Sequence, residues 1–167
     1  MGMVALFTPV NQEAHFSRTS LLGLKKGRTS VRLSTAVDDL MDAAYEGSSS
    51  VDIDKAWDML HRCLNGGKAE PLRATLAAKA IYGDANVEAD GEAMMLVSKE
   101  TVQEVAPALL ALDDTEIARL LATLDPDDVY CMNGEDDLEY VIQGLNTLRG
   151  FYKSAAEAKD AVVVVIA

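Results

Sequence analysis

The sequence predicts an α+β fold in which one mixed β-sheet packs against several α-helices. Two apolar runs, residues 3–8 and 161–166, are rich in aromatic or β-branched side chains and have the length of strands. Between them, much of the chain repeats apolar residues at the spacing of amphipathic helices. Because no internal repeat and no clear linker divides the sequence, we expect a single domain over residues 1–167.

The strands are predicted from composition and from the residues that end them. Residues 3–8 are ended by Pro9, and residues 161–166 contain four valines and an isoleucine. A strand that is apolar on both faces needs cover on both, so we expect residues 161–166 near the centre of the sheet, flanked by helices and beside residues 3–8. A third strand over residues 93–97 stops at Ser98, a natural N-cap for the helix that follows.

The helices are predicted from apolar periodicity. It indicates helices over residues 34–46, 52–65, 99–112, 114–124 and 135–159. Pro107 is expected to kink or divide the third of these. In the last one, Gly144 and Gly150 each weaken the helix by roughly 1 kcal/mol relative to Ala, which suggests that they allow close helix packing. Residues 11–32 and 66–92 show no clear pattern.

Residues 52–65 contain the only Trp, one of the two His and one of the two Cys. Wound as a helix, this segment has an apolar face made of Ile53, Ala56, Trp57, Leu60, Cys63 and Leu64. We expect Trp57, Leu60 and Leu64 to anchor the core. Their burial together is worth on the order of 5–9 kcal/mol as an upper value.

A polar strip lies beside that apolar face. Asp54, Asp58 and His61 are spaced at i, i+4 and i+7, with Asn65 one turn further on. Such side chains can converge on one ion, or a carboxylate can orient the imidazole for proton transfer, so they are the candidate catalytic residues. Three side chains of one helix rarely close a metal site alone, and we expect no metal and no cofactor.

The same strip also has a purely structural explanation, which we consider the better one. Asp52 or Asp54 can cap the helix, and Asp58 can pair with Arg62 or Lys55.

Other segments of the sequence match no catalytic or ligand-binding motif. Residues 65–68 lack the spacing of a phosphate-binding loop, residues 125–130 do not match a calcium loop, and neither GxSxG nor HExxH occurs.

The chain is acidic, with a net charge of −12. This charge repels phosphate backbones and anionic lipid, so nucleic acid and membrane surfaces are poor partners. Residues 113–139 contain ten carboxylates and one base, and most of these acids can simply begin helices and face water. The other interpretation is a docking surface for a basic protein, with the candidate binding residues Asp127, Asp128, Asp136 and Asp137.

Cysteine content and hydropathy bear on where the protein works. Cys63 and Cys131 form no CxxC pair and have no His at metal spacing, which is typical of a reduced intracellular protein. No apolar run is long enough to span a bilayer, and the first ten residues lack the pattern of a signal peptide. We therefore expect the protein in the cytoplasm.

Several segments together resemble the YfbM-like family of bacterial proteins, a domain of unknown function. The likeness is strongest in MGM at residues 1–3, DIDKAWDMLH at 52–61, LEYVIQGL at 138–145 and FYKSAAE at 151–157. The resemblance implies a small α+β domain with a mixed sheet and a bacterial cytosolic protein. None of these segments is a catalytic signature, so the resemblance implies a lineage and no reaction.

Two functions remain open from the sequence. The leading one is a non-enzymatic binding protein, immunity-type or regulatory, that uses the acidic surface to cover a basic partner. The alternative is a small-ligand-binding protein or hydrolase-like enzyme that uses Asp54, Asp58 and His61, with Tyr82 or Tyr130 across a cleft. The sequence indicates neither a substrate, nor the identity of a partner, nor an oligomeric state.

Overall fold

The computed structural model describes residues 3–16, 21, 30–32, 49–88 and 93–167, and within these residues six strands form one sheet. The order of the strands is β2-β4-β5-β6-β1-β3. β2 runs parallel to β4, and the other neighbouring strands are antiparallel, so the sheet is mixed and the predicted α+β class is confirmed. The strands are β1 (Ala5–Val10), β2 (Ser30–Arg32), β3 (Val51–Asp52), β4 (Ala85–Glu88), β5 (Ala93–Val97) and β6 (Ala161–Ile166).

β6 is an inner strand of the sheet, paired with β1 on one side and β5 on the other. All of its residues are buried. Val162, Val164 and Ile166 belong to the larger apolar cluster together with helix residues, whereas the alternate residues, Ala161, Val163 and Val165, belong to a second cluster. Because successive side chains of a strand point to opposite faces, this alternation gives the sheet a core on each face. The predicted bounds of this strand and its predicted neighbour are confirmed.

β1 differs from the prediction at both ends. It begins at Ala5 and continues through Pro9 to Val10, although Pro9 was expected to end it. Pro9 has no N–H to donate to a neighbouring strand, which confines proline to positions where one side of the strand is free. The ladder between β1 and β3 covers only Leu6 and Phe7, so the side of Pro9 that would face β3 is not engaged in that ladder.

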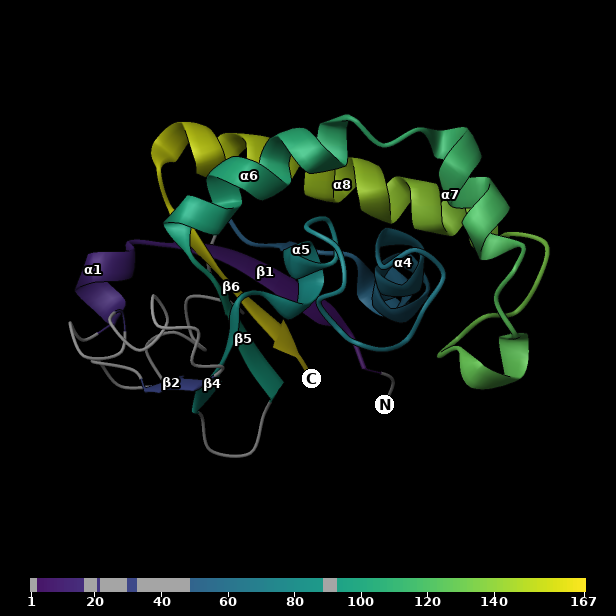
Figure 1. The fold of residues 1–167 in the computed structure, drawn as a ribbon, viewed down its shortest axis with the longest axis horizontal. Coiled ribbons are helices and arrows are strands. Elements are labelled where there is room, and N and C mark those ends of the chain that lie inside the picture. The colour runs from purple at the N-terminus through teal and green to yellow at the C-terminus, as the bar shows by residue number, and fades with distance from the viewer. Residues whose placement is uncertain (1–2, 17–20, 22–29, 33–48, 89–92) are drawn as a thin grey trace.

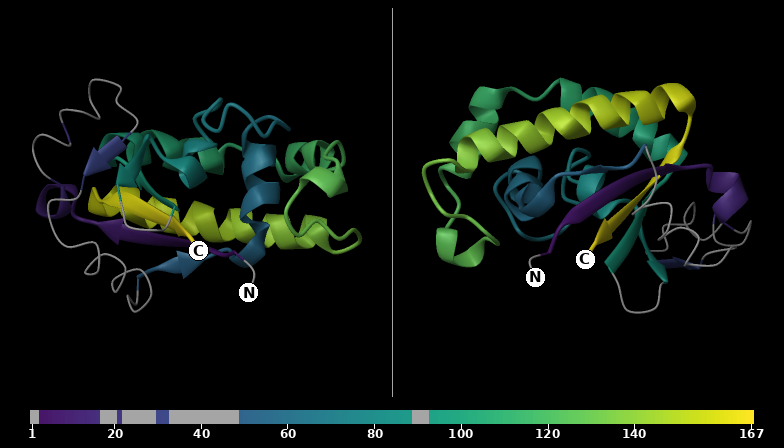
Figure 2. Two further views of the ribbon diagram at one scale, coloured as in Figure 1. Left: turned by 90° about the horizontal axis from the view of Figure 1, so that it is seen from below. Right: turned by 180° about the vertical axis from the view of Figure 1, so that it is seen from behind.

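The helices gather mainly on one side of the sheet (Figures 1 and 2). In Figure 1, α6 and α8 run along the top, with α4 and α5 below them. Apolar side chains of these helices share the larger core cluster with Phe7, Val97 and Val164 of the strands. The helices and 3-10 turns are α1 (Gln12–His15), η1 (Asp54–Ala56), α4 (Trp57–Leu64), α5 (Lys79–Tyr82), α6 (Lys99–Leu110), α7 (Asp114–Leu121), η2 (Pro126–Asp128) and α8 (Asp137–Ala158).

The helices predicted over residues 99–112, 114–124 and 135–159 are present with shorter ends. Ser98 caps α6 by accepting a hydrogen bond from the Thr101 N–H, and Asp113 caps α7 in the same way. Pro107 neither divides nor ends α6, which is continuous to Leu110. It lies in the last turn, and its carbonyl still accepts from the Ala111 N–H at 3.0 Å. The helix predicted over residues 34–46 lies outside the described residues.

The helix predicted over residues 52–65 starts later than expected. Val51 and Asp52 form β3, which pairs with Leu6 and Phe7 of β1, and a single 3-10 turn precedes the α-helix at Trp57. Pairing with a distant strand extends the chain here and overrides the local helical spacing. α5 and β4, within residues 66–92, were not predicted at all. None of the described helices is long and apolar enough to cross a membrane.

Candidate functional site

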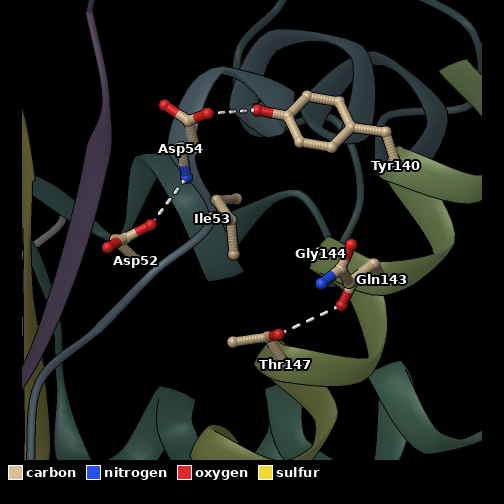
Figure 3. A pocket seen from close by; sticks show the side chains of 7 residues that line it. All are labelled: Asp52, Ile53, Asp54, Tyr140, Gln143, Gly144 and Thr147. Carbon is tan, nitrogen blue, oxygen red and sulfur yellow. Dashed lines mark hydrogen bonds between the residues drawn. The ribbon is translucent and has the colours of Figure 1, made fainter.

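A small pocket lies between the start of the 52–65 segment and α8 (Figure 3). Its volume is about 110 Å³. One wall is the turn that leads from β3 into η1, and the other is a face of α8. The lining residues are Asp52, Ile53, Asp54, Tyr140, Gln143, Gly144 and Thr147.

Gly144 lies where α8 passes the turn. A Cβ at this position would stand 3.6 Å from the Cβ atoms of Ile53 and Ala56 and 3.7 Å from the nearest atom of Leu60. An alanine at residue 144 would therefore meet these side chains at ordinary van der Waals contact, so the approach of α8 to the turn does not depend on the glycine that the sequence pointed to. Gly150 is different, because such a Cβ would have nothing within 4 Å.

Asp54 and Tyr140 connect the two walls of the pocket. The Tyr140 hydroxyl donates to Asp54 Oδ2 at 2.7 Å and accepts from the Lys55 N–H at 3.0 Å. Burial raises the pKa of the Tyr140 phenol, and the hydrogen bond to Asp54 raises it further. The phenol therefore keeps its proton at neutral pH and remains the donor of this pair.

Asp54 adopts a left-handed backbone conformation, with φ +47°. This conformation costs a residue with a side chain roughly 1–2 kcal/mol, although Asp and Asn tolerate it better than most. The Asp54 N–H donates to Asp52 Oδ1 at 3.1 Å, which helps to hold the turn. Both acids line the pocket, with the Asp54 carboxylate facing Tyr140 and the Asp52 carboxylate on the other side of Ile53 (Figure 3).

Two wider hollows adjoin this pocket along α8. One, of about 480 Å³, shares Asp54 and Tyr140 with the pocket and extends to the loop before α8. The other, of about 620 Å³, is shallow and shares Gln143 and Thr147 with it. We call the pocket and these hollows the α8 groove. Beyond the seven pocket residues, it is lined by Lys55, Cys131, Asn133, Gly134, Glu135, Asp136, Asp137, Glu139, Ile142 and Asn146.

The four candidate binding acids do not share one environment. Asp127, Asp128 and Asp136 are exposed. Asp137 is only 7% exposed and accepts hydrogen bonds from the backbone N–H groups of Asn133 and Gly134. Its carboxylate therefore orders the loop before α8, and only Asp136 of these four is an exposed acid that lines the groove.

The structure does not bring the three candidate catalytic residues together. Asp54 lines the groove, whereas Asp58 pairs with Arg62 at 3.3 Å and accepts from the Tyr130 N–H at 2.9 Å. His61 is 1% exposed, and its Nε2 lies 2.8 Å from the Leu72 carbonyl oxygen. Each side chain has separate partners, and the described part of the chain holds no cluster of three His, Cys, Asp or Glu residues suited to a metal.

Burial favours the neutral form of both His61 and Cys63. Burial lowers the pKa of the His61 imidazole, although the Leu72 carbonyl acts in the opposite direction. Burial raises the pKa of the Cys63 thiol to about 12, so it stays protonated and unreactive at neutral pH. Trp57, Leu60 and Leu64 lie in the core, and the Trp57 ring packs 5.9 Å from the ring of Tyr130.

Sequence reasoning missed the α8 side of the pocket. Tyr140, Gln143 and Thr147 are spaced at i, i+3 and i+7, so they lie on one face of the helix, next to Gly144. The sequence signal that could have located this wall is Gly144 next to a polar stripe on a long amphipathic helix. Tyr140 is half-buried at this face.

The architecture is that of a small α+β protein built on a mixed sheet with helices mainly on one face, and the comparisons with known proteins agree with it. The chain belongs to the family described as "Domain of unknown function (DUF1877)", whose model matches residues 1–165. This match confirms the family likeness seen in the sequence.

One solved structure with this fold is the crystal structure of YfbM from Escherichia coli, a protein of unknown function. The two structures match with a TM-score of 0.64 at 18% sequence identity, over 98% of this chain and 99% of the YfbM chain. At this identity, the likeness shows a shared fold alone. No curated protein matches the chain.

Proposed function

We propose that the protein is a non-enzymatic binding protein that docks a basic segment of a partner protein in the α8 groove. In this proposal the pocket beside Asp52 and Asp54 takes the head of one Lys or Arg side chain from that segment. The observation that carries the proposal is the pair of carboxylates at the pocket, at a point where the pocket and the wider hollow share Asp54 and Tyr140.

The size of the pocket fits a side-chain head better than a free ligand. Sites for drug-sized ligands and cofactors enclose about 300–1,000 Å³. The pocket has about 110 Å³, and the adjoining hollows are open and shallow. A peptide segment that lies along the surface and inserts one side chain matches this shape.

The charge of the groove favours a basic segment. Its lining includes Asp52, Asp54, Glu135, Asp136 and Glu139, with Lys55 as the only base among its described residues. Charge complementarity of this kind speeds association and discourages acidic partners. Asp127 and Asp128 on η2 add further negative charge, and in this proposal they contribute to steering the partner.

The enzyme hypothesis gains no support from this geometry. A hydrolase needs a base, a nucleophile and a reacting atom within hydrogen-bond reach of one another. His61 is buried beneath Leu72, and Asp58 is engaged by Arg62 and the Tyr130 N–H, so Asp54 faces the groove without them. We infer a cytoplasmic setting from the two free cysteines, Cys63 and Cys131, and a bacterial source from the family likeness alone.

The test measures binding of fluorescent Lys- and Arg-rich peptides from an array, by anisotropy at physiological ionic strength. The variant Asp52→Asn/Asp54→Asn removes two charges but keeps the acceptor oxygens, and Asn tolerates the left-handed backbone of residue 54. Glu104→Gln/Glu157→Gln removes the same charge from exposed sites away from the groove and is the matched control.

We expect the groove variant to weaken binding about tenfold, because each lost ion pair in a partly enclosed site is worth about 0.5–1 kcal/mol. The control variant should change binding less than twofold. Equal weakening by both variants would mean that only net charge matters, and an array with no binder above background would refute the proposal.

A further inference from the structure

Residues 66–78, between α4 and α5, form a segment without helix or strand that is held down by side chains of the α4 end. We call this segment the strap. The Asn65 side chain donates to the carbonyls of Lys68 and Pro71, at 3.0 and 2.8 Å, and accepts from the Ala74 N–H at 2.9 Å. The Thr75 hydroxyl donates to the Leu64 carbonyl at 2.6 Å.

We propose that the strap is an acid-released segment and that His61 is the group that releases it. His61 supplies the tether at the middle of the strap, because its Nε2 donates to the Leu72 carbonyl at 2.8 Å. Its ring stands edge-on to Tyr82 of α5, with 4.5 Å between the ring centroids. The imidazole is thus enclosed by α4, the strap and α5, and it is 1% exposed.

Protonation places a charge in this enclosed position. The Nε2–H donates to Leu72 in both protonation states, so the added proton sits on Nδ1. The charged and titratable groups that face the ring are Asp58 and Arg62 from α4, Glu70 from the strap and Tyr82 from α5. Asp58 and Glu70 favour the imidazolium and Arg62 disfavours it, but burial is the largest influence and lowers the pKa of His61.

Opening of the strap is the least costly way to hydrate the charged ring. α4 itself carries Trp57 and Leu60, so its displacement would disrupt the core. Seven of the thirteen strap residues are exposed, although Ala77 and Ala78 at its end are buried. Its middle is attached mainly through side chains, and besides the ties to α4, Arg73 donates to the carbonyls of Tyr82 and Gly83. Segments of this kind open locally at a small fraction of the free energy of global unfolding. Acid therefore favours a state in which the strap is released and His61 is in water.

The test is hydrogen exchange of the backbone amides of residues 66–78 in the whole chain, between about pH 7.5 and about pH 5, corrected for intrinsic exchange rates. We expect opening of the strap to increase as the pH falls, by at most about tenfold per pH unit, the limit for one proton. Amides of α8 should show no such increase. His61→Gln keeps a side-chain N–H donor for Leu72 but cannot titrate, so its strap should open to the same extent at both pH values.

His15→Gln removes the other imidazole and serves as the matched control, with the same acid response as the unaltered chain. Unchanged opening between the two pH values, or an identical acid response in His61→Gln, would overturn the proposal. If His61→Gln fails to fold, titration of the His61 ring by NMR in the unaltered chain decides. A midpoint below about 6.5 with concerted shifts of the strap amides supports acid release, and a midpoint at the ordinary value or silent strap amides refutes it.

Discussion

The two ends of residues 52–65 carry similar polar side chains and use them differently. At the start, Asp52 and Asp54 lie at the wall of a pocket, and Asp54 meets the hydroxyl of Tyr140. At the end, His61 and Asn65 are 1% and 2% exposed and bind backbone groups of the strap. The sequence places all of them on or beside one polar strip. Spacing alone therefore does not distinguish polar residues of a binding surface from buried polar residues that hold a neighbouring segment.

What covers each end explains the difference. α8 passes the first end at Gly144, and the lack of a side chain there leaves room beside Ile53. The strap folds over the other end and supplies carbonyls for the buried amide and imidazole. A polar group is stable in a protein interior only when such partners are present, and once engaged it is no longer available to a ligand.

The largest loss of stability is expected at Trp57, which lies in the core between the two ends of residues 52–65. Trp57→Ala removes a side chain that is 7% exposed and packs against Tyr130, and it should lower the free energy of unfolding by about 3–5 kcal/mol. Urea denaturation measures this loss. Leu138→Ala, at a side chain that is 41% exposed, is the control and should cost less than about 1 kcal/mol. Equal losses would mean that Trp57 is no anchor.

The buried end should respond to loss of a polar group more strongly than the pocket end. Asn65→Ala leaves two carbonyls and the Ala74 N–H without their partner, and we expect a loss of about 2–3 kcal/mol. Gln143→Ala in the pocket wall should change stability by less than about 0.5 kcal/mol. The same denaturation experiment compares the two. A larger loss for Gln143→Ala would reverse the assignment of the two ends.

The pH dependence of global stability should come partly from the buried end. Burial lowers the pKa of folded His61 below the unfolded value of 6.5, so the unfolded chain binds more protons between these two values. The free energy of unfolding should therefore fall as the pH drops through about 6.5, and this contribution should level off below the folded pKa. Urea midpoints from about pH 8 to about pH 5 measure it. His61→Gln should flatten this part of the curve, and parallel curves would contradict the assignment.

The smallest effect on stability is expected at the pocket end. Asp54→Asn keeps an acceptor for the Tyr140 hydroxyl and suits φ +47°, so the free energy of unfolding should change by less than about 0.5 kcal/mol. Thermal denaturation at neutral pH suffices to detect a larger change. A loss above about 1.5 kcal/mol would show that Asp54, like Asn65, is needed to hold the fold.

The parts of the fold that sequence could predict are those decided by local composition. Ala161–Ile166 is apolar on both faces, and only a strand covered on both faces satisfies that pattern. Ser98 and Asp113 cap helices through contacts within three residues, which a sequence displays directly. β3 was missed because its extended backbone depends on pairing with Leu6 and Phe7, far away in the chain.

The candidate site was only half predictable for the same reason. Asp54 stood out because of its spacing from Asp58 and His61, but its actual partner, Tyr140, comes from α8. Asp137 belongs to a run of acids and was read as surface, whereas two backbone amides of the preceding loop take its carboxylate into the protein. Contacts between distant segments and amides presented by a loop leave no mark on local charge or periodicity.

The position of β6 between β1 and β5 has a consequence for biosynthesis. A ribosome makes β1 and β5 long before it makes their common neighbour, so both strands emerge with an unpaired edge. β6 can join the two halves of the sheet only after Ile166 has left the exit tunnel. Until then, the unpaired edges of β1 and β5 can pair with other nascent chains. Chaperones that shield extended apolar segments should therefore raise the yield of folded protein more than they affect its final stability.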